Sequence, residues 1–219
     1  MMPLDVIDDA IDTVTLPEAN TSPPEQTNPE IITIQLSPVI DLTDEQFFQF
    51  CQINRELNIE MTAGGELIIM PPTGADTGSS NFRLLGQLYV WMENNQQGMG
   101  FDSSTGFILP NGSKRSPDAA WVRLERWQTL TPEQQQRFAP LCPDFVVELR
   151  SASDQLSMLQ EKMQEYIENG AQLGWLIDRS QRRVYIYRPG IAVECLEQSV
   201  SIDGDPVLPG FVLNLTRIW

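Results

Sequence analysis

Histidine is absent from the 219 residues of the chain. No imidazole can therefore act as a general base, activate a nucleophile or bind a metal ion. Cysteine occurs only three times, at widely spaced positions, which excludes a disulfide framework and a zinc site. We expect the cysteines to be reduced thiols. Any catalysis must then use carboxylates, Lys, Arg, Tyr, Ser or Cys, and a hard metal ion is the expected cofactor.

Long apolar runs are also missing. No stretch approaches the roughly eighteen apolar residues that a membrane-spanning helix needs. The first residues do not combine a basic segment with an apolar core, as a secretory signal would. We therefore expect no membrane span and a cytoplasmic location.

Positive charge is scarce. The chain has 14 Lys and Arg against 30 Asp and Glu, which gives a formal net charge of −16. Such a field repels polyanions and argues against strong non-specific binding of nucleic acid. It leaves room for a local basic groove or for a metal ion that bridges to phosphate.

The first part of the chain differs in composition from the rest. Its segment PEANTSPPEQTNPE is rich in Pro, Asn, Thr and Glu and has no apolar period. We predict a flexible acidic tail over residues 1–30, followed by a single domain over residues 31–219. A domain of that length can bury a substantial core.

Local patterns predict the elements of the first half of this domain. Thr43 and Gln46 form a capping box at the start of a helix in LTDEQFFQFCQIN. Gly64 and Gly65 mark the turn of a hairpin in LNIEMTAGGELIIMPP. A second helix is predicted in TGSSNFRLLGQLYVWMENN. Its expected apolar stripe consists of Phe82, Leu85, Leu88 and Met92.

The second half predicts a buried strand in CPDFVVELRS, a helix in SDQLSMLQEKMQEYIENGA, and a strand–turn–strand unit in LGWLIDRSQRRVYIYRPG. Ser153 or Asp154 should cap the helix, and Gly170 should end it. Strands and helices therefore intermingle along the chain. The predicted fold class is α/β (α+β), with helices packed on a mixed sheet.

Acidic residues interrupt two of the apolar strands. In CPDFVVELRS, residues two apart face the same side, so Glu148 and Arg150 share a face. A buried carboxylate needs a cation, a hydrogen-bond network or a metal. Asp118, in SPDAAWV, enters another apolar strand and can meet Glu148 if the two strands are neighbours. Two carboxylates plus a strand carbonyl would suit magnesium or manganese.

Such a site would also use a lysine, which positions the water or stabilises a developing charge. Lys162 and Tyr166 are four residues apart on the predicted helix and lie on one of its faces. Arg150 stands on the same strand face as Glu148, but it remains protonated and cannot act as a base.

Four segments together resemble the Uma-two family of proposed endonucleases: SPD at 116–118, PDFVVELRSASD at 143–154, EKMQEYIENGAQLGWLID at 161–178, and FDSSTGFILPNGSKRSPDAAWV at 101–122. The resemblance covers roughly residues 40 to 200. It implies a restriction-endonuclease-like fold of the PD-(D/E)XK type, with a central mixed sheet flanked by helices. An additional N-terminal hairpin and the tail would then extend this core.

The resemblance also implies a chemistry, which is metal-dependent cleavage of phosphodiester bonds. Asp118 matches the motif aspartate, Glu148 matches the acid of the E-x-K element, and Arg150 occupies its lysine position. Lys162 matches a lysine that such proteins can carry on the following helix. The expected metal ligands are Asp118, Glu148 and the Leu149 carbonyl, for one or two Mg or Mn ions. The implied substrate is nucleic acid, DNA rather than RNA, and the implied assembly is a homodimer.

Structural interpretations remain open for each of these residues. Asp118 could satisfy a turn amide, and Lys162 could be a solvated surface residue. Glu148 could pair with Arg150 or Lys162 as a structural ion pair. The alternative to a magnesium-dependent endonuclease is therefore a catalytically inactive or partner-dependent interaction protein that keeps the fold. In the partner-dependent case another chain would supply the basic surface.

Overall fold

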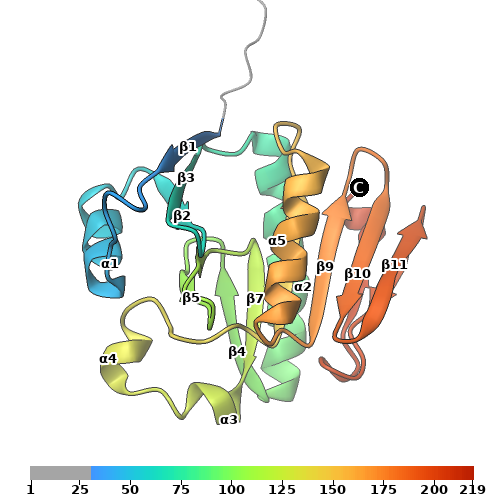
Figure 1. Ribbon diagram of the computed structural model, residues 1–219. Helices are drawn as coiled ribbons and strands as arrows, with labels where there is room; N and C mark the ends of the chain where they lie inside the picture. Colours follow the sequence, from blue (N-terminus) through green and yellow to red (C-terminus); the bar gives the residue numbers. More distant parts are fainter. Residues whose placement is uncertain (1–30) are drawn as a thin grey trace, which may run out of the picture.

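The computed structural model describes residues 31–219 (Figure 1). The predicted tail, residues 1–30, lies outside the described residues. Within the described part, no helix is both long and apolar enough to cross a membrane. All three cysteines are free thiols, as expected.

The elements of the first half alternate short strands and helices. They are β1 (Ile32–Gln35), α1 (Asp44–Ile53), β2 (Asn58–Met61), β3 (Glu66–Met70), α2 (Ala75–Asn95), β4 (Gly98–Asp102), β5 (Phe107–Ile108), β6 (Lys114–Arg115) and β7 (Ala119–Arg123). The second half contains α3 (Leu124–Trp127), α4 (Pro132–Gln135), β8 (Phe145–Arg150), α5 (Leu156–Glu168), β9 (Leu173–Asp178), β10 (Arg183–Arg188), β11 (Ile191–Glu197), β12 (Ser201–Asp203), β13 (Val212–Asn214) and the 3₁₀ turn η1 (Leu215–Arg217).

The strands form two main sheets and a small third one. The larger sheet has six strands in the order β11-β10-β9-β8-β7-β4. Only β8 and β9 are parallel within it, and its other neighbours are antiparallel. The second sheet has the order β1-β3-β2-β6-β5 and contains the predicted N-terminal hairpin, β2 and β3. The mixed central sheet predicted from the sequence is therefore present.

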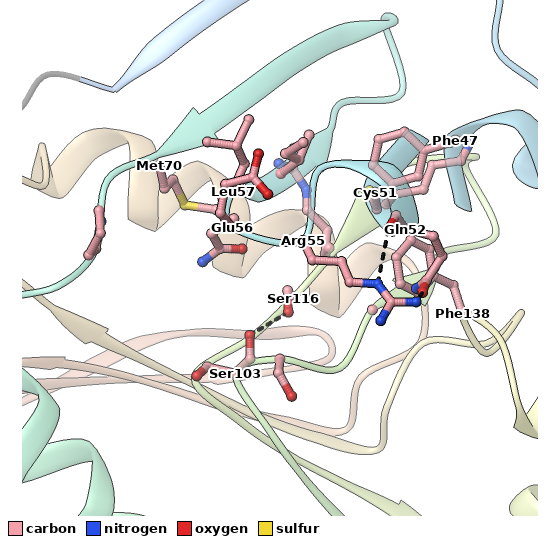
Figure 2. Close-up of a pocket in the computed structure, with 17 residues that line it drawn as sticks. Phe47, Cys51, Gln52, Arg55, Glu56, Leu57, Met70, Ser103, Ser116 and Phe138 are labelled. Carbon is pink, nitrogen blue, oxygen red and sulfur yellow. Dashed lines mark hydrogen bonds between the residues drawn. The ribbon is translucent and has the colours of Figure 1, made fainter. Parts of the chain in front are cut away.

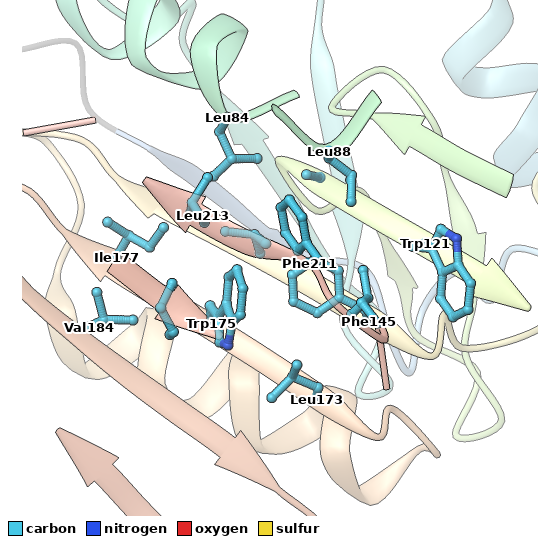
Figure 3. Packing of buried hydrophobic residues seen from close by; sticks show 14 of the residues in the cluster. Leu84, Leu88, Trp121, Phe145, Leu173, Trp175, Ile177, Val184, Phe211 and Leu213 are labelled. Atoms are coloured by element: carbon cyan, nitrogen blue, oxygen red, sulfur yellow. The ribbon is translucent and has the colours of Figure 1, made fainter. Parts of the chain in front are cut away.

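Helices α2 and α5 cover opposite faces of the six-stranded sheet (Figure 1). Strand β8 shows why, because its side chains alternate between the two faces. Phe145 and Val147 pack in the core that includes α2, whereas Val146 packs with Met163 and Tyr166 of α5. Figure 3 shows the core on the α2 side, where the Phe145 and Trp175 rings meet edge to face. Because a helix covers each face of the sheet, we expect the polar side chains of a site at the ends of its strands.

Most of the predicted helix and turn signals are confirmed. Thr43 and Gln46 form the capping box of α1, and Gly65 adopts a positive φ of 80° in the hairpin turn. Gly170, with φ of 113°, follows the end of α5. The predicted cap of α5 is wrong, because Gln155 is its N-cap and makes no side-chain cap bond. Asp154 instead accepts a hydrogen bond from the Ser151 amide and closes the preceding turn.

The predicted apolar stripe of α2 is wrong at one position. Phe82 is 77% exposed, whereas Leu84 and Leu88 are each only 2% exposed. The helix is rotated relative to the predicted stripe because Trp91 packs against the rings of Trp121 and Phe211. The remaining members of that stripe, Leu85 and Met92, lie at the edge of this core.

This rotation can be tested with two substitutions on the same helix. Leu88→Ala should lower the free energy of unfolding by about 2–5 kcal/mol, because it leaves a cavity in the core. Phe82→Ala should change that free energy by about 0.5 kcal/mol or less, because the ring is exposed. Urea unfolding of both variants measures the difference, and equal losses would contradict the observed helix orientation.

Candidate active site

Asp118 and Glu148 lie opposite one another where β7 and β8 meet. The strands pair antiparallel with Ala119 opposite Val147, so the preceding residue, Asp118, falls opposite Glu148. Side chains of directly opposed residues point to the same face of a sheet. Here that is the α5 face, which also holds Ala120 and Val146. The predicted site required the two strands to be neighbours, and they are.

The carboxylate of Asp118 is fixed by the strand next to it. Its Oδ2 accepts a hydrogen bond of 2.7 Å from the backbone N–H of Leu149. Its Oδ1 has a longer contact, 3.5 Å, with Nδ2 of Asn81 on α2. At this end of the β7–β8 pairing, the Asp118 carboxylate thus accepts the bond that a backbone carbonyl would otherwise accept. The carboxylate is thereby held beside Glu148.

Helix α5 supplies two donors to Glu148. Lys162 Nζ lies 2.8 Å from Glu148 Oε1, and the Tyr166 hydroxyl donates to the same oxygen at 3.1 Å. The spacing of one helical turn had predicted that Lys162 and Tyr166 share a face. The structure shows that this face covers the end of β8. Lys162 is only 11% exposed, so it is not a solvated surface lysine.

Glu60, on β2, completes this network and was missed by the sequence analysis. Its side chain is 2% exposed, and its Oε1 lies 2.8 Å from Lys162 Nζ. It also accepts hydrogen bonds from the Ser116 backbone N–H at 2.8 Å and from Arg115 Nη1 at 3.2 Å. The available signal was the one used for Glu148, an acid inside an apolar strand, here flanked by Ile59 and Met61.

Arg150 lies near the site but contacts a different carboxylate. Its Nη1 is 2.6 Å from Oδ2 of Asp178, and its Nε donates to the Asp154 carbonyl at 3.2 Å. Asp178 is the residue opposite Arg150 in the parallel pairing of β8 with β9, and it is fully buried. Among the residues the structure describes, Arg150 makes no ion pair with Glu148, which is bound by Lys162 instead.

Burial dominates the electrostatics of the two opposed acids. It raises the pKa of Asp118 to about 6, although the Leu149 N–H favours the charged form. Burial also raises the pKa of Glu148, and the neighbouring charges of Asp118 and Glu60 act in the same direction, against Lys162. Protons bind both acids more tightly than usual. A cation placed between them would therefore relieve an unfavourable concentration of negative charge.

The basic side chains remain charged. Burial opposes the charge on Lys162, but Glu148 and Glu60 together hold its pKa above the ordinary value. Burial likewise opposes ionisation of Glu60, yet Lys162 and Arg115 together lower its pKa. Lys162 is thus a permanent ammonium group between two glutamates. It can donate hydrogen bonds and stabilise negative charge, but it cannot accept a proton near neutral pH.

The donor set around Asp118 and Glu148 fits a magnesium or manganese ion. Their oxygens Oδ1 and Oε2 make no hydrogen bond shorter than 3.5 Å to any described residue. No group of three or more His, Cys, Asp or Glu side chains in residues 31–219 is arranged to hold a metal ion. Asp118 and Glu148 would therefore offer two carboxylate ligands to such an ion. That number is enough for Mg²⁺, which binds through one or two carboxylates and keeps several waters.

A cleft of about 600 Å³ adjoins this network (Figure 2). Arg115 and Ser116, which both bind Glu60, also line the cleft. Ser116 Oγ donates to the Ser103 carbonyl at 2.8 Å, and Arg55 also borders the cleft. The surface next to the candidate site is thus concave and carries both hydroxyl and basic groups.

Comparison with solved structures identifies the class of fold. A protein from Anabaena variabilis ATCC 29413, described as "a putative nuclease belonging to DUF820", is similar with a TM-score of 0.66 and 16% sequence identity. The similarity covers 81% of this chain and 97% of that one. A helix-flanked mixed sheet of the kind seen in that protein is therefore the fold of this chain.

The sequence itself identifies the family. Residues 44–216 match the family Uma2, described as "Putative restriction endonuclease". The match covers most of the chain, and the protein belongs to this family. No curated protein matches the chain.

The raised pKa of Asp118 predicts a pH-dependent effect of Asp118→Asn on the metal-free protein. The folded state holds the proton more tightly than the unfolded state, so wild type loses stability as the pH rises from about 4 through about 6. A pKa raised from 3.8 to about 6 corresponds to about 3 kcal/mol. The neutral amide of the variant avoids this loss, and its oxygen can still accept the Leu149 N–H bond.

Asp118→Asn should therefore stabilise the protein at pH 8 by up to about 3 kcal/mol, and the gain should vanish below pH 4. Urea unfolding with EDTA at pH 4, 6 and 8 measures it. Glu93→Gln, which replaces an exposed acid on α2, is the control. A variant less stable than wild type at pH 8 would show that the charged carboxylate stabilises the fold.

Proposed function

We propose that the protein is a magnesium-dependent or manganese-dependent endonuclease that hydrolyses phosphodiester bonds of nucleic acid. The observation that carries the proposal is the pair of opposed carboxylates, Asp118 and Glu148, with the Lys162 ammonium bound to one of them. Membership in a family described as "Putative restriction endonuclease" supports it.

Asp118, Glu148 and the Leu149 carbonyl would hold one or two ions. A bound ion would neutralise phosphate charge and lower the pKa of water. The reaction consumes one water: its oxygen bonds to phosphorus, one of its protons passes to solvent, and the bond to the leaving nucleotide oxygen breaks while that oxygen takes a proton from solvent. The Leu149 N–H fixes the orientation of Asp118, and Tyr166 fixes that of Glu148.

Lys162 has an electrostatic role in this proposal. Its ammonium, held 2.8 Å from both Glu148 and Glu60, is fixed before substrate arrives. A donor fixed in advance stabilises the charge that develops on the transferring phosphoryl group and needs no rearrangement to do so. Glu60 is then a positioning residue, because it acts on the reaction only through Lys162.

Arg150 is assigned an indirect role. Its guanidinium is bound to buried Asp178, which links the ends of the parallel strands β8 and β9. Arginine cannot act as the base, and here its charge is already paired. We propose that Arg150 holds the end of β8 in place and adds only a weak field at the site.

DNA is the proposed substrate, rather than RNA, and a homodimer in the cytoplasm is the proposed state. One observation favours the alternative of a partner-dependent or inactive protein. Among the described residues, only Arg55, Arg83, Arg182 and Arg217 lack an acidic partner in an ion pair. The net charge of −16 leaves few unpaired basic groups for binding nucleic acid, and a second copy or another chain could supply the basic surface.

Substitution of either acid should remove activity without unfolding the chain. Glu148→Gln and Asp118→Ala should each lower the rate of Mg²⁺-dependent plasmid nicking by at least about 100-fold, because each deletes one of two charged ligands. Glu93→Gln should nick at the wild-type rate. Nicking by both site variants at the wild-type rate would refute the assignment, and tight metal binding without any cleavage would favour the inactive alternative.

Lys162 and Arg150 can be separated by the kind of loss that each substitution causes. Lys162→Met should lower the single-turnover rate by about 100-fold or more, because it removes a donor that acts in the reaction. Arg150→Met should mainly lower the free energy of unfolding, because it leaves Asp178 buried without its cation. Single-turnover nicking and urea unfolding of both variants, each checked for folding by circular dichroism, measure the split. Equal rate losses would assign Arg150 a direct role.

A further inference from the structure

The side-chain oxygen of Asn81 is buried and lacks a hydrogen-bond partner. Among the described residues only three buried side-chain atoms share this property, and the other two are the indole nitrogens of Trp121 and Trp175. Leaving a buried polar atom unpaired costs about 1–3 kcal/mol, so a native structure that tolerates one calls for an explanation such as an ion or a water. Asn81 Oδ1 is the one acceptor of the three.

The amide group that carries this oxygen contacts the candidate active site. The amide nitrogen of Asn81 is 3.5 Å from Asp118 Oδ1, beyond the usual 2.7–3.2 Å for such a bond. The contact therefore satisfies neither group well. Asn81 approaches the acidic pair from α2, whereas Lys162 approaches it from α5. Asp118 is thus next to a neutral amide, whereas Glu148 is next to a cation.

The part of α2 that carries Asn81 is firmly anchored. The neighbouring Ser80 donates to the Ile218 carbonyl at 3.1 Å. Asp76, in the first turn, forms an ion pair with Arg179, which in turn donates to the same Ile218 carbonyl at 3.0 Å. The backbone of α2 beside Asn81 is therefore fixed, and the contact of its amide with Asp118 directs the side chain towards the acidic pair.

We infer that Asn81 Oδ1 is a further, neutral oxygen ligand for the divalent cation of the Asp118–Glu148 site, bound directly or through one of the waters of the cation. Amide oxygens are ordinary ligands of hard cations. A carboxylate here would add negative charge beside Asp118, Glu148 and Glu60, whereas an amide adds an oxygen without charge. This inference rests on the proposed metal site.

The test is calorimetric titration of MnCl₂ into the full chain, without nucleic acid. Asn81→Ala should weaken Mn²⁺ binding by about 10–100-fold, as the loss of a metal-site partner commonly does. Asn81→Asp should bind at least as tightly as wild type, because it keeps the oxygen and adds charge. Asn94→Ala is the matched control, since Asn94 lies exposed on the same helix and donates only to the Val90 carbonyl.

A second readout separates a ligand from a structural residue. The unfolding midpoint of metal-free Asn81→Ala in EDTA should be no lower than that of wild type, because no strong contact is lost. A lowered midpoint with unchanged Mn²⁺ affinity would overturn the inference. So would folded Asn81→Asp that fails to bind, and this variant keeps the test valid if Asn81→Ala folds poorly.

The failure of this inference differs from the failure of the proposed function. If wild type binds Mn²⁺, Asp118→Asn does not, and Asn81→Ala binds as wild type does, the metal site stands and Asn81 is not part of it. If wild type itself binds no Mn²⁺ or Mg²⁺, the proposed metal site falls, and the role of Asn81 falls with it.

Discussion

The ammonium group of Lys162 is the interaction on which the site depends. It lies 2.8 Å from Glu60 and from Glu148, and so joins α5 to one strand of each main sheet. Two buried carboxylates with no cation between them would be severely destabilising, and breaking one buried pair alone costs about 3–5 kcal/mol. The same charge therefore holds the N-terminal hairpin on the central sheet and sets the electrostatics of the acidic pair.

The two faces of β8 divide stability and function between them. Phe145 and Val147 pack into the apolar core under α2, which consists of aliphatic and aromatic side chains (Figure 3). The opposite face ends in Glu148, whose raised pKa is a measure of unfavourable burial. The stable core on the α2 face allows the unfavourable burial of this acid on the α5 face to persist.

The sequence predicted the features that depend on local rules. Strand alternation in CPDFVVELRS and the spacing of Lys162 and Tyr166 describe the structure correctly, because both follow from the geometry of one element. Strand alternation alone did not place Asp118 beside Glu148. That expectation depended on the condition that the two strands are neighbours, and the pairing of β7 with β8 meets it.

The features that were missed depend on partners distant in sequence. Nothing near Glu60 indicates that α5 lies over the hairpin, and its lysine is 102 residues away. Arg150 was expected near Glu148 from their spacing, yet the parallel register with β9 places Asp178 closer. Phe82 was misplaced because aromatic rings on other elements, those of Trp121 and Phe211, determine which side of α2 is buried.

The long sequence separation between Glu60 and Lys162 also has a consequence for folding. Contacts that close such large loops form late, because the chain must first lose the entropy of closure. On a ribosome, β2 emerges well before its partner on α5 has been synthesised. The ion pair of Glu60 and Lys162 can therefore form only after α5 has been synthesised, and partial unfolding that detaches the hairpin breaks it. A half-folded chain would carry the acids Asp118 and Glu148 without the fully positioned lysine between its two glutamates.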